Sequence, residues 1–286
     1  MHNISSDPYL SGYTYRTLAS QAICDKGDTR YMQELSSGIN PELVEDNDLL
    51  YVTGNQVVNF FTQIAPLINK RYSVITAQWD EGVSQAIVDI LPENLIMWFT
   101  INAHILHDKI TPIPLGLQNL HWRKDGNIQS SPTTYKKYHT LNSPNDVLAS
   151  FSVNNNLDER RECLTFARRN IPTLKEHTFT SFNRNDDPFV DDYFAMASQY
   201  KMVLCPWGAG YDTHRLWETM YLGSIPVTRF CRAYRDFIDY PIIFLNNWSE
   251  LNLDNLLKEY EIQLEKLRND GRIYIESWAN TIDGLL

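Results

Sequence analysis

The feature that most constrains this fold is a repeated alternation of short apolar runs with segments of helical periodicity. The runs LLYV, YSVIT, LIMWF and ITPIPL lie between residues 49 and 115. The segment 55–70 separates the first two runs and places apolar side chains at helical spacing. These side chains are Val57, Phe60, Phe61, Ile64, Leu67 and Ile68. Such alternation is typical of a parallel sheet covered by helices, so this half of the chain is expected to be α/β.

The same alternation starts again after a polar stretch. Residues 121–145 are rich in Ser, Thr, Asn and Pro and contain no long apolar run, which is typical of a linker or surface excursion. A chain of 286 residues is long enough for two domains of ordinary size. We therefore predict two Rossmann-like domains, 1–140 and 141–286, that face each other across a cleft. It stays open whether the last helix packs back on the first domain.

Composition excludes several classes of partner. The formal net charge is −10, so the overall field repels nucleic acid and acidic membranes, and an anionic ligand needs a local cluster of cations or amides. No apolar run approaches the roughly 20 residues of a membrane span, and the N-terminal residues do not resemble a signal peptide. The four cysteines are far apart and suggest free thiols. We expect a cytoplasmic protein without a nucleic-acid partner or a membrane span.

The segment CPWGAGYDTHRLWETMYLGSIPV, Cys205–Val227, reads as a strand end, a glycine loop, a helix and a second strand. Arg215 opens the helix, where the macrodipole disfavours a cation by a few tenths of a kcal/mol. A helix N-terminus reached through Gly208 and Gly210 is also a common phosphate site. Each hydrogen bond from arginine to phosphate contributes roughly 1.5 to 3 kcal/mol, which exceeds the dipole cost. A bound diphosphate therefore explains the position of Arg215.

The polar face of this helix extends the same interpretation. His214, Arg215 and Glu218 lie three and four residues apart on one stripe, and Thr213 is placed to cap the helix. Glu218 lies one turn inside the helix, where a carboxylate can accept hydrogen bonds from ribose hydroxyls. The alternative stays open that Arg215 and Glu218 form an ordinary surface ion pair and that the glycines only turn the chain.

The Cys205–Val227 segment resembles the donor-binding motif of exostosin-like glycosyltransferases of family 47, which include small viral inverting enzymes such as the chlorovirus xylosyltransferases. In that family a proline and glycine loop leads into D-x-H-R-x-W-E, followed by a glycine and IPV. The segments FSVNNNLDERRE, ITAQWDEG, MWFTINAHI and ITPIPLGLQN also resemble the family, so the likeness runs from about Leu49 to Trp248.

The resemblance implies a glycosyltransferase-B architecture, with the acceptor on the first domain and a nucleotide-sugar donor on the second. It implies transfer with inversion at the anomeric carbon. Arg215 corresponds to a diphosphate ligand, Glu218 to the ribose ligand and Arg160 to a second phosphate cation. The complete set of donor-binding candidates is Arg160, Gly208, Gly210, Tyr211, Asp212, Thr213, His214, Arg215 and Glu218.

Inverting transfer needs a base to take the proton of the acceptor hydroxyl. Asp80 is the candidate, because it follows the strand YSVIT closely and an ordinary aspartate is ionised at neutral pH. The alternative is that Asp80 only turns the chain into the next helix. Trp79 and Asn102 are the candidates for contact with the acceptor.

The sequence predicts catalysis without a metal or other cofactor. Asp46 and Asp48 form the only Asp-x-Asp pair, but they precede a strand, so a polar turn is the better interpretation. Retaining transferases of this architecture usually carry two glutamates eight residues apart, whereas Gly210 and Pro226 occupy those positions around Glu218. The expected donor is a UDP-sugar, with UDP-xylose as one candidate, and the expected acceptor is a glycan or glycoprotein. A GDP-sugar transferase and a non-catalytic nucleotide-sugar or glycan-binding module are the alternatives.

Overall fold

The computed structural model describes residues 8–24, 38–118, 138–141, 143–177 and 189–285, without the side chains of 189–192. The chain divides into two compact units. The first combines Met1–Gly126 with Arg272–Leu286, and the second is Asn127–Gly271. The sequence analysis placed the boundary at residue 140 and left the position of the last helix open. In the structure this helix, α10 (Ile275–Leu285), belongs to the first unit.

The first unit contains a five-stranded sheet in which every neighbouring pair of strands is parallel. The strands follow one another in chain order: β1 (Gln21–Ile23), β2 (Asp48–Thr53), β3 (Tyr72–Ala77), β4 (Leu95–Thr100) and β5 (Ile110–Pro112). Short helices accompany them: α1 (Gly12–Arg16), α3 (Val57–Asn59) and α4 (Gln85–Val88). The sequence analysis did not anticipate α1 or β1, since their apolar patterns are too short to stand out.

The helical segment before β3 differs from the regular helix that the sequence predicted. After α3 the backbone forms a π-helical turn, Phe60–Ile64, and then a 3-10 turn, Ala65–Leu67. Phe60 and Phe61 are buried as expected, but Leu67 is 62% exposed. Because π and 3-10 turns have different numbers of residues per turn, the change of helix type rotates Leu67 off the buried stripe.

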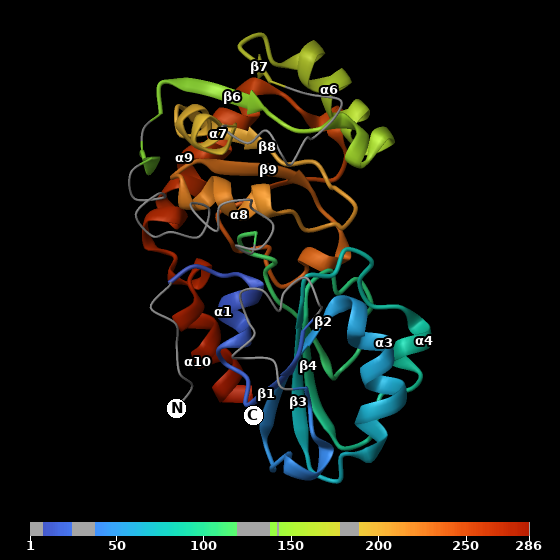
Figure 1. The fold of residues 1–286 in the computed structure, drawn as a ribbon. Coiled ribbons are helices and arrows are strands. Elements are labelled where there is room, and N and C mark those ends of the chain that lie inside the picture. The colour runs from blue at the N-terminus through green and yellow to red at the C-terminus, as the bar shows by residue number, and fades with distance from the viewer. Residues whose placement is uncertain (1–7, 25–37, 119–137, 142, 178–188, 286) are drawn as a thin grey trace. The chain divides into compact units, whose positions relative to one another are not determined.

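The second unit contains another fully parallel sheet, in the order β10-β9-β8-β6-β7. Its strands are β6 (Asn145–Ala149), β7 (Lys175–Glu176), β8 (Tyr200–Leu204), β9 (Ile225–Arg229) and β10 (Ile243–Leu245). Its helices are α6 (Leu157–Asn170), α7 (Phe189–Ala197), α8 (His214–Tyr221) and α9 (Leu253–Asn269). Figure 1 shows β6, β8 and β9 side by side, with α8 next to β9.

The strand order of the second unit contains a reversal. From β6 the chain adds β7 on one side, and then β8, β9 and β10 on the other side. In open parallel sheets, the space beyond the carboxyl ends of the strands at such a switch point is the usual ligand site. Here the switch point lies between β6 and β8, so a ligand site is expected at the loops that follow these two strands.

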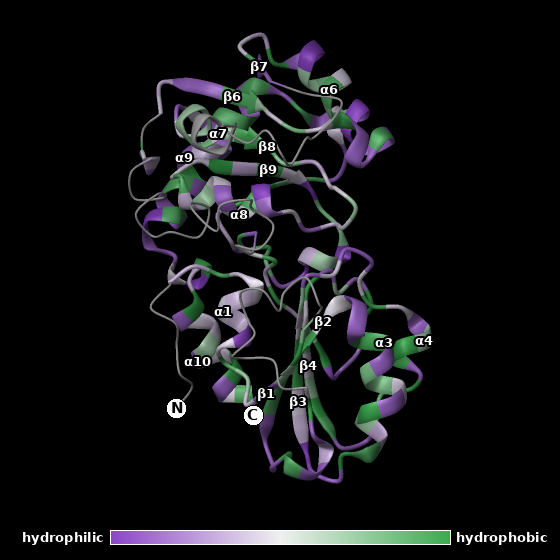
Figure 2. Cartoon of the chain, viewed as in Figure 1, coloured by the Kyte–Doolittle hydropathy of each residue, from purple (hydrophilic) through white to green (hydrophobic). Residues whose placement is uncertain are grey.

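Burial follows the pattern expected of covered parallel sheets. Figure 2 shows hydrophobic residues along the strands of both units and mixed residues on helices such as α6 and α9. Trp98 and Phe99 on β4 and Val203 and Leu204 on β8 are fully buried. Two Rossmann-like units with parallel sheets are what the sequence predicted, and this α/β class is confirmed.

Candidate functional site

The two loops at the switch point lead directly into helices. The loop after β6 enters α6, and the glycine loop 205–213 after β8 enters α8. All of the donor-binding candidates lie in this loop, in α8 or at the start of α6. The structure therefore brings Arg160, which is distant from the motif in sequence, to the same edge of the sheet.

Arg160 ties the two loops together. It is 3% exposed, its Nε donates a 2.9 Å hydrogen bond to the carbonyl of Trp207, and its Nη1 donates to the carbonyl of Ser152. Its guanidinium also lies over the ring of Phe151, 5.7 Å from the centroid. A planar guanidinium can make these divergent contacts at once, so it positions the glycine loop as well as carrying charge.

The glycine loop is held in a compact turn. The amide of Gly208 donates to the carbonyl of Gly210 at 3.0 Å, and Nδ2 of Asn156 donates to the carbonyl of Gly208 at 3.0 Å. A Cβ at Gly208 would lie 3.1 Å from Nη2 of Arg160. A side chain at this position would therefore require the guanidinium of Arg160 to shift by a few tenths of an ångström.

Tyr211 and Asp212 have structural contacts on the far side of the loop. Both carboxylate oxygens of Asp212 accept hydrogen bonds from the indole N–H of Trp217, at 2.9 and 3.0 Å. The hydroxyl of Tyr234 donates to the carbonyl of Tyr211. Asp212 is 5% exposed and Trp217 is fully buried, so these bonds fix where the loop joins α8.

Thr213 occupies the N-cap position of α8, but its side chain does not cap the helix. Its backbone is extended, at φ −130° and ψ 143°. The buried Oγ1 has no hydrogen-bond partner among the described residues. The sequence predicted the position correctly and the capping bond wrongly. The hydroxyl therefore has a donor that no described residue uses, at a helix N-terminus where other donors are also unpaired.

Arg215 is half-buried in the first turn of α8 and lies against Tyr193 of α7. Its guanidinium carbon is 5.3 Å from the centroid of the tyrosine ring. Its buried Nε has no hydrogen-bond partner within the described part of the chain. Burial lowers the pKa of Arg215, but Tyr193 and the charge of Glu218 outweigh that effect and the pKa rises. The side chain is thus held as a cation with an unused donor.

Two cations share this region. Burial and then the charge of Arg215 lower the pKa of Arg160 to about 10. Repulsion of this kind means that the protonated pair is held at a free-energy cost, which a bound anion would reduce. The same helix face carries Glu218, which is 5% exposed, and the half-buried His214. The charge of Glu218 helps to raise the pKa of Arg215, as expected for two side chains close together on α8.

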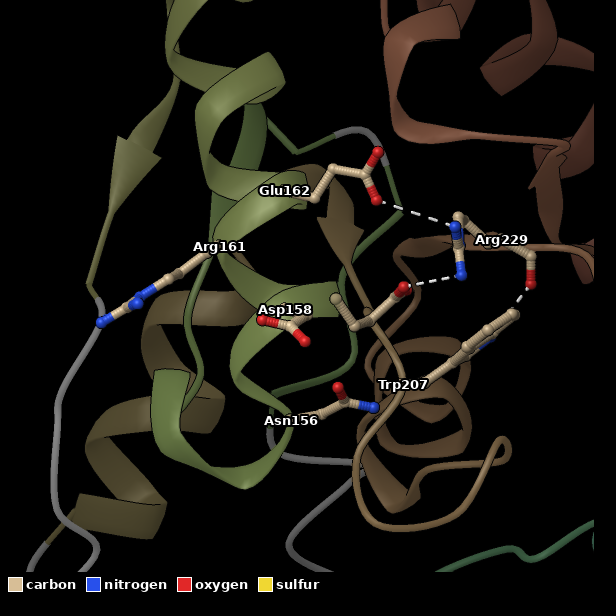
Figure 3. A pocket seen from close by; sticks show the side chains of 7 residues that line it. Asn156, Asp158, Arg161, Glu162, Trp207 and Arg229 are labelled. Atoms are coloured by element: carbon tan, nitrogen blue, oxygen red, sulfur yellow. Dashed lines mark hydrogen bonds and ion pairs between the residues drawn. The ribbon is translucent and has the colours of Figure 1, made fainter.

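A pocket of about 490 Å³ adjoins the outer side of the glycine loop. Figure 3 shows Arg229 at its edge, in ion pairs with Glu159 at 2.8 Å and with Glu162 at 3.7 Å. The Arg229 guanidinium also covers the ring of Trp207, 4.2 Å from the centroid. Arg229 therefore contacts both glutamates and Trp207, and we interpret these contacts as support for the position of Trp207.

The acceptor-side candidates lie in the first unit, just beyond the carboxyl ends of β3 and β4. Asp80 is exposed. Trp79 is only 7% exposed and packs against Trp98, and a Cβ on Gly54 would lie 2.2 Å from the Cβ of Trp79. Asn102 is 3% exposed and donates to the carbonyl of Trp79 at 2.7 Å. The contacts of Trp79 and Asn102 therefore fix the position of the loop that contains Asp80.

The sequence analysis missed two contributors to the switch-point site. Tyr193 lies under Arg215, and Asn156 binds the glycine loop. The sequence around each residue does not indicate this role. An aromatic residue on an amphipathic helix is normally predicted to be core, and an asparagine before a helix is normally predicted to be an N-cap. Asn156 does precede α6, but its side chain makes no capping hydrogen bond.

Within the residues that the structure describes, no group of three or more His, Cys, Asp or Glu side chains is placed to hold a metal ion. Asp46 and Asp48 accept hydrogen bonds from the amides of Arg71 and Glu45, as expected for a polar turn. No helix in the described ranges has the length and hydropathy needed to cross a membrane.

Fold and site together define a two-unit Rossmann-like protein with two arginines and a helix N-terminus at one switch point. No family model matches the chain, and no curated protein matches it. It is similar in structure to a UDP-forming α,α-trehalose-phosphate synthase from Burkholderia vietnamiensis, with 9% identity, a TM-score of 0.47 and coverage of 96% of this chain and 82% of that chain.

Two further solved structures are similar to it. WaaG, a glycosyltransferase involved in lipopolysaccharide biosynthesis, has 12% identity and a TM-score of 0.37, covering 90% of this chain and 80% of that one. The pneumococcal O-GlcNAc transferase GtfA, in complex with UDP and GlcNAc, has 13% identity and a TM-score of 0.36, covering 90% and 59%. These values are too low to transfer a residue role or an activity.

Proposed function

We propose that this chain is an inverting glycosyltransferase that moves a sugar from a nucleoside-diphosphate sugar to a hydroxyl of a glycan or glycoprotein. The observation that carries the proposal is the pair of arginines at the switch point. Arg160 and Arg215 repel each other, and the unpaired Nε of Arg215 and Oγ1 of Thr213 lie at the start of α8. Donors and positive charge gathered at a helix N-terminus suit a diphosphate.

The remaining residues have distinct roles in this proposal. Glu218, one turn deeper in α8, accepts from the ribose hydroxyls, and the amides of the glycine loop approach the phosphates. Asp80 takes the proton from the acceptor hydroxyl as its oxygen forms a bond to the anomeric carbon. The bond from that carbon to the diphosphate oxygen breaks on the opposite side, which inverts the configuration. The departing diphosphate keeps the electron pair, and the arginines stabilise its charge, so no metal is required.

The proposal becomes more specific when it names the sugar donor and the enzyme family. A UDP-sugar is the first candidate and UDP-xylose one example, supported by the resemblance of the Cys205–Val227 segment to exostosin-like enzymes of family 47 and their small viral relatives. The cytoplasm, here that of a virus-infected cell, is the corresponding location. A GDP-sugar transferase is the nearest rival. A non-catalytic module with the same donor site predicts binding of the donor without transfer or hydrolysis.

Calorimetric titration with UDP, GDP and ADP, with and without chelator, tests the donor site. We expect UDP to bind most tightly, to be unaffected by chelator, and to lose at least tenfold in affinity in Arg215→Ala, since a charge-assisted hydrogen bond contributes about 1.5 to 3 kcal/mol. Arg169→Ala is the matched control, because Arg169 is exposed in the last turn of α6. If Arg215→Ala binds UDP as tightly as the wild type does, the proposed diphosphate site is wrong. Tight UDP binding without transfer to any glycan would favour the binding module.

A further inference from the structure

We infer that Tyr193 is a positioning residue that holds Arg215 in the orientation needed to bind the diphosphate. The inference rests on the proposed function, which it deepens by adding a residue from a different helix. Tyr193 belongs to α7, the helix that precedes β8, whereas Arg215 belongs to the helix that follows β8. The tertiary fold alone brings these two side chains together.

The contact is of the cation–π kind. The guanidinium carbon of Arg215 lies 5.3 Å from the centroid of the Tyr193 ring, within the roughly 6 Å over which the ring attracts a cation. Such contacts are strongest where water is excluded, and both side chains are at least half-buried. The ring thus offers Arg215 a favourable surface on one side while the Nε–H stays unpaired.

The site needs such a support because Arg215 has a like charge nearby. Repulsion from Arg160 favours conformations in which the two guanidiniums separate, and the main-chain bonds of Arg160 prevent it from moving. Arg215 is the partner that is free to turn away. The Tyr193 ring, over which the guanidinium of Arg215 lies, and the charge of Glu218, which raises the pKa of Arg215, oppose that movement. Holding a cation in place before the ligand arrives reduces the ordering cost of binding.

The ring carries this role more than the hydroxyl does. Burial raises the pKa of Tyr193, so the side chain stays neutral at physiological pH and does not form an ion pair with Arg215. Its buried hydroxyl lies close enough to Arg215 to contribute to the pKa of both groups, but it forms no hydrogen bond of good geometry in the described structure. Phenylalanine should therefore replace Tyr193 with little loss, whereas an aliphatic side chain should not.

A double-mutant cycle tests the inference. Dissociation constants for UDP and for inorganic pyrophosphate are measured for wild type, Tyr193→Leu, Tyr193→Phe, Arg215→Ala and Arg215→Ala combined with Tyr193→Leu. We expect Tyr193→Leu to weaken both ligands about tenfold to thirtyfold, and Tyr193→Phe to stay within about threefold of wild type. In the Arg215→Ala background, Tyr193→Leu should have almost no further effect, because a residue that acts through Arg215 loses its influence with it. In steady-state assays, KM for the donor should rise more than kcat falls.

Each other result has a clear meaning. If Arg215→Ala weakens UDP but Tyr193→Leu does not, or if the two effects simply add, the inference is wrong and the proposed diphosphate site stands. If Arg215→Ala leaves UDP binding unchanged, both are wrong. If Tyr193→Phe loses as much affinity for UDP as Tyr193→Leu does, the hydroxyl positions Arg215 and the cation–π explanation is wrong. Circular dichroism shows whether Tyr193→Leu is folded, and Tyr193→Met replaces it in the cycle if it is not.

Discussion

The side-chain amide of Asn102 donates a 2.7 Å hydrogen bond to the main-chain carbonyl of Trp79, the residue before Asp80. This bond joins the loop after β4 to the loop after β3. Asn102 adopts a positive φ of 52° to make it, and a Cβ on Gly82 would come within 2.5 Å of the Asn102 carbonyl. Asp80 is exposed, but it lies between Trp79, which accepts this hydrogen bond, and Gly82, whose backbone lies close to Asn102.

Removing the hydrogen bond from Asn102 to the Trp79 carbonyl should destabilise the first unit. Asn102→Gly keeps the positive φ available but leaves the Trp79 carbonyl without its partner, so we expect the free energy of unfolding to fall by about 1 to 3 kcal/mol. Urea denaturation measures the change. Asn47→Gly is the control, since Asn47 also has a positive φ, of 71°, and its side chain is exposed. Equal unfolding midpoints for both variants would show that the bond contributes nothing.

Replacing the proposed base should separate catalysis from donor binding. Asp80→Asn keeps the shape of the side chain but cannot accept the proton, so we expect the transfer rate to fall about 10²- to 10⁴-fold with the UDP dissociation constant unchanged. Radiolabelled sugar transfer and calorimetry provide the two measurements. Glu81→Gln is the comparison, because Glu81 is the next exposed carboxylate in the same loop. Full activity in Asp80→Asn together with lost activity in Glu81→Gln would reassign the base to Glu81.

Adding a methyl group to the glycine loop should disturb Arg160. In Gly208→Ala the new Cβ would lie 3.1 Å from Nη2 of Arg160, so the guanidinium has to shift by a few tenths of an ångström. We expect UDP affinity to fall about tenfold, because charge-assisted hydrogen bonds depend on alignment. Gly271→Ala is matched chemically, and its Cβ would have nothing within 4 Å. A Gly208→Ala protein that binds UDP like the Gly271→Ala protein would contradict this account.

A lysine should not replace Arg160. The ammonium of Arg160→Lys keeps the charge but cannot reach the Trp207 and Ser152 carbonyls in the two directions that the guanidinium covers. We expect UDP affinity to fall at least tenfold, since hydrogen bonds to charged groups contribute about 1.5 to 3 kcal/mol. Amide hydrogen exchange in the loop 205–213 should also become faster. Wild-type affinity and exchange in this variant would mean that Arg160 contributes only charge.

Much of this molecule follows from local sequence patterns. The apolar runs around β2, β3, β4 and β8 predicted strands because hydrophobic periodicity reports which face of an element is buried. The glycine loop and Arg215 predicted a site at the start of α8 because a helix N-terminus has unpaired amides wherever it occurs. Elements too short for a period, such as β1 and β7, could not be recognised in this way.

Contacts between distant segments were beyond such patterns. The sequence made Trp79 a candidate for contact with the acceptor, and only the structure shows that its side chain is buried against Gly54. Thr213 was predicted to cap α8, but its hydroxyl makes no capping hydrogen bond and has no partner among the described residues. For Trp79, packing against a residue distant in sequence decided the outcome, which no local pattern could show.

The sequence by itself determined the α/β class and the place of the glycine loop at the start of α8, since both depend on the order of residues along the chain. Only the tertiary structure decided that β6 and β8 are neighbours, that Arg160 faces the charge of Arg215, and that Tyr193 lies beneath it. The physical reason is that periodicity records whether a side chain is buried, whereas strand order and side-chain packing decide which residues share the same space.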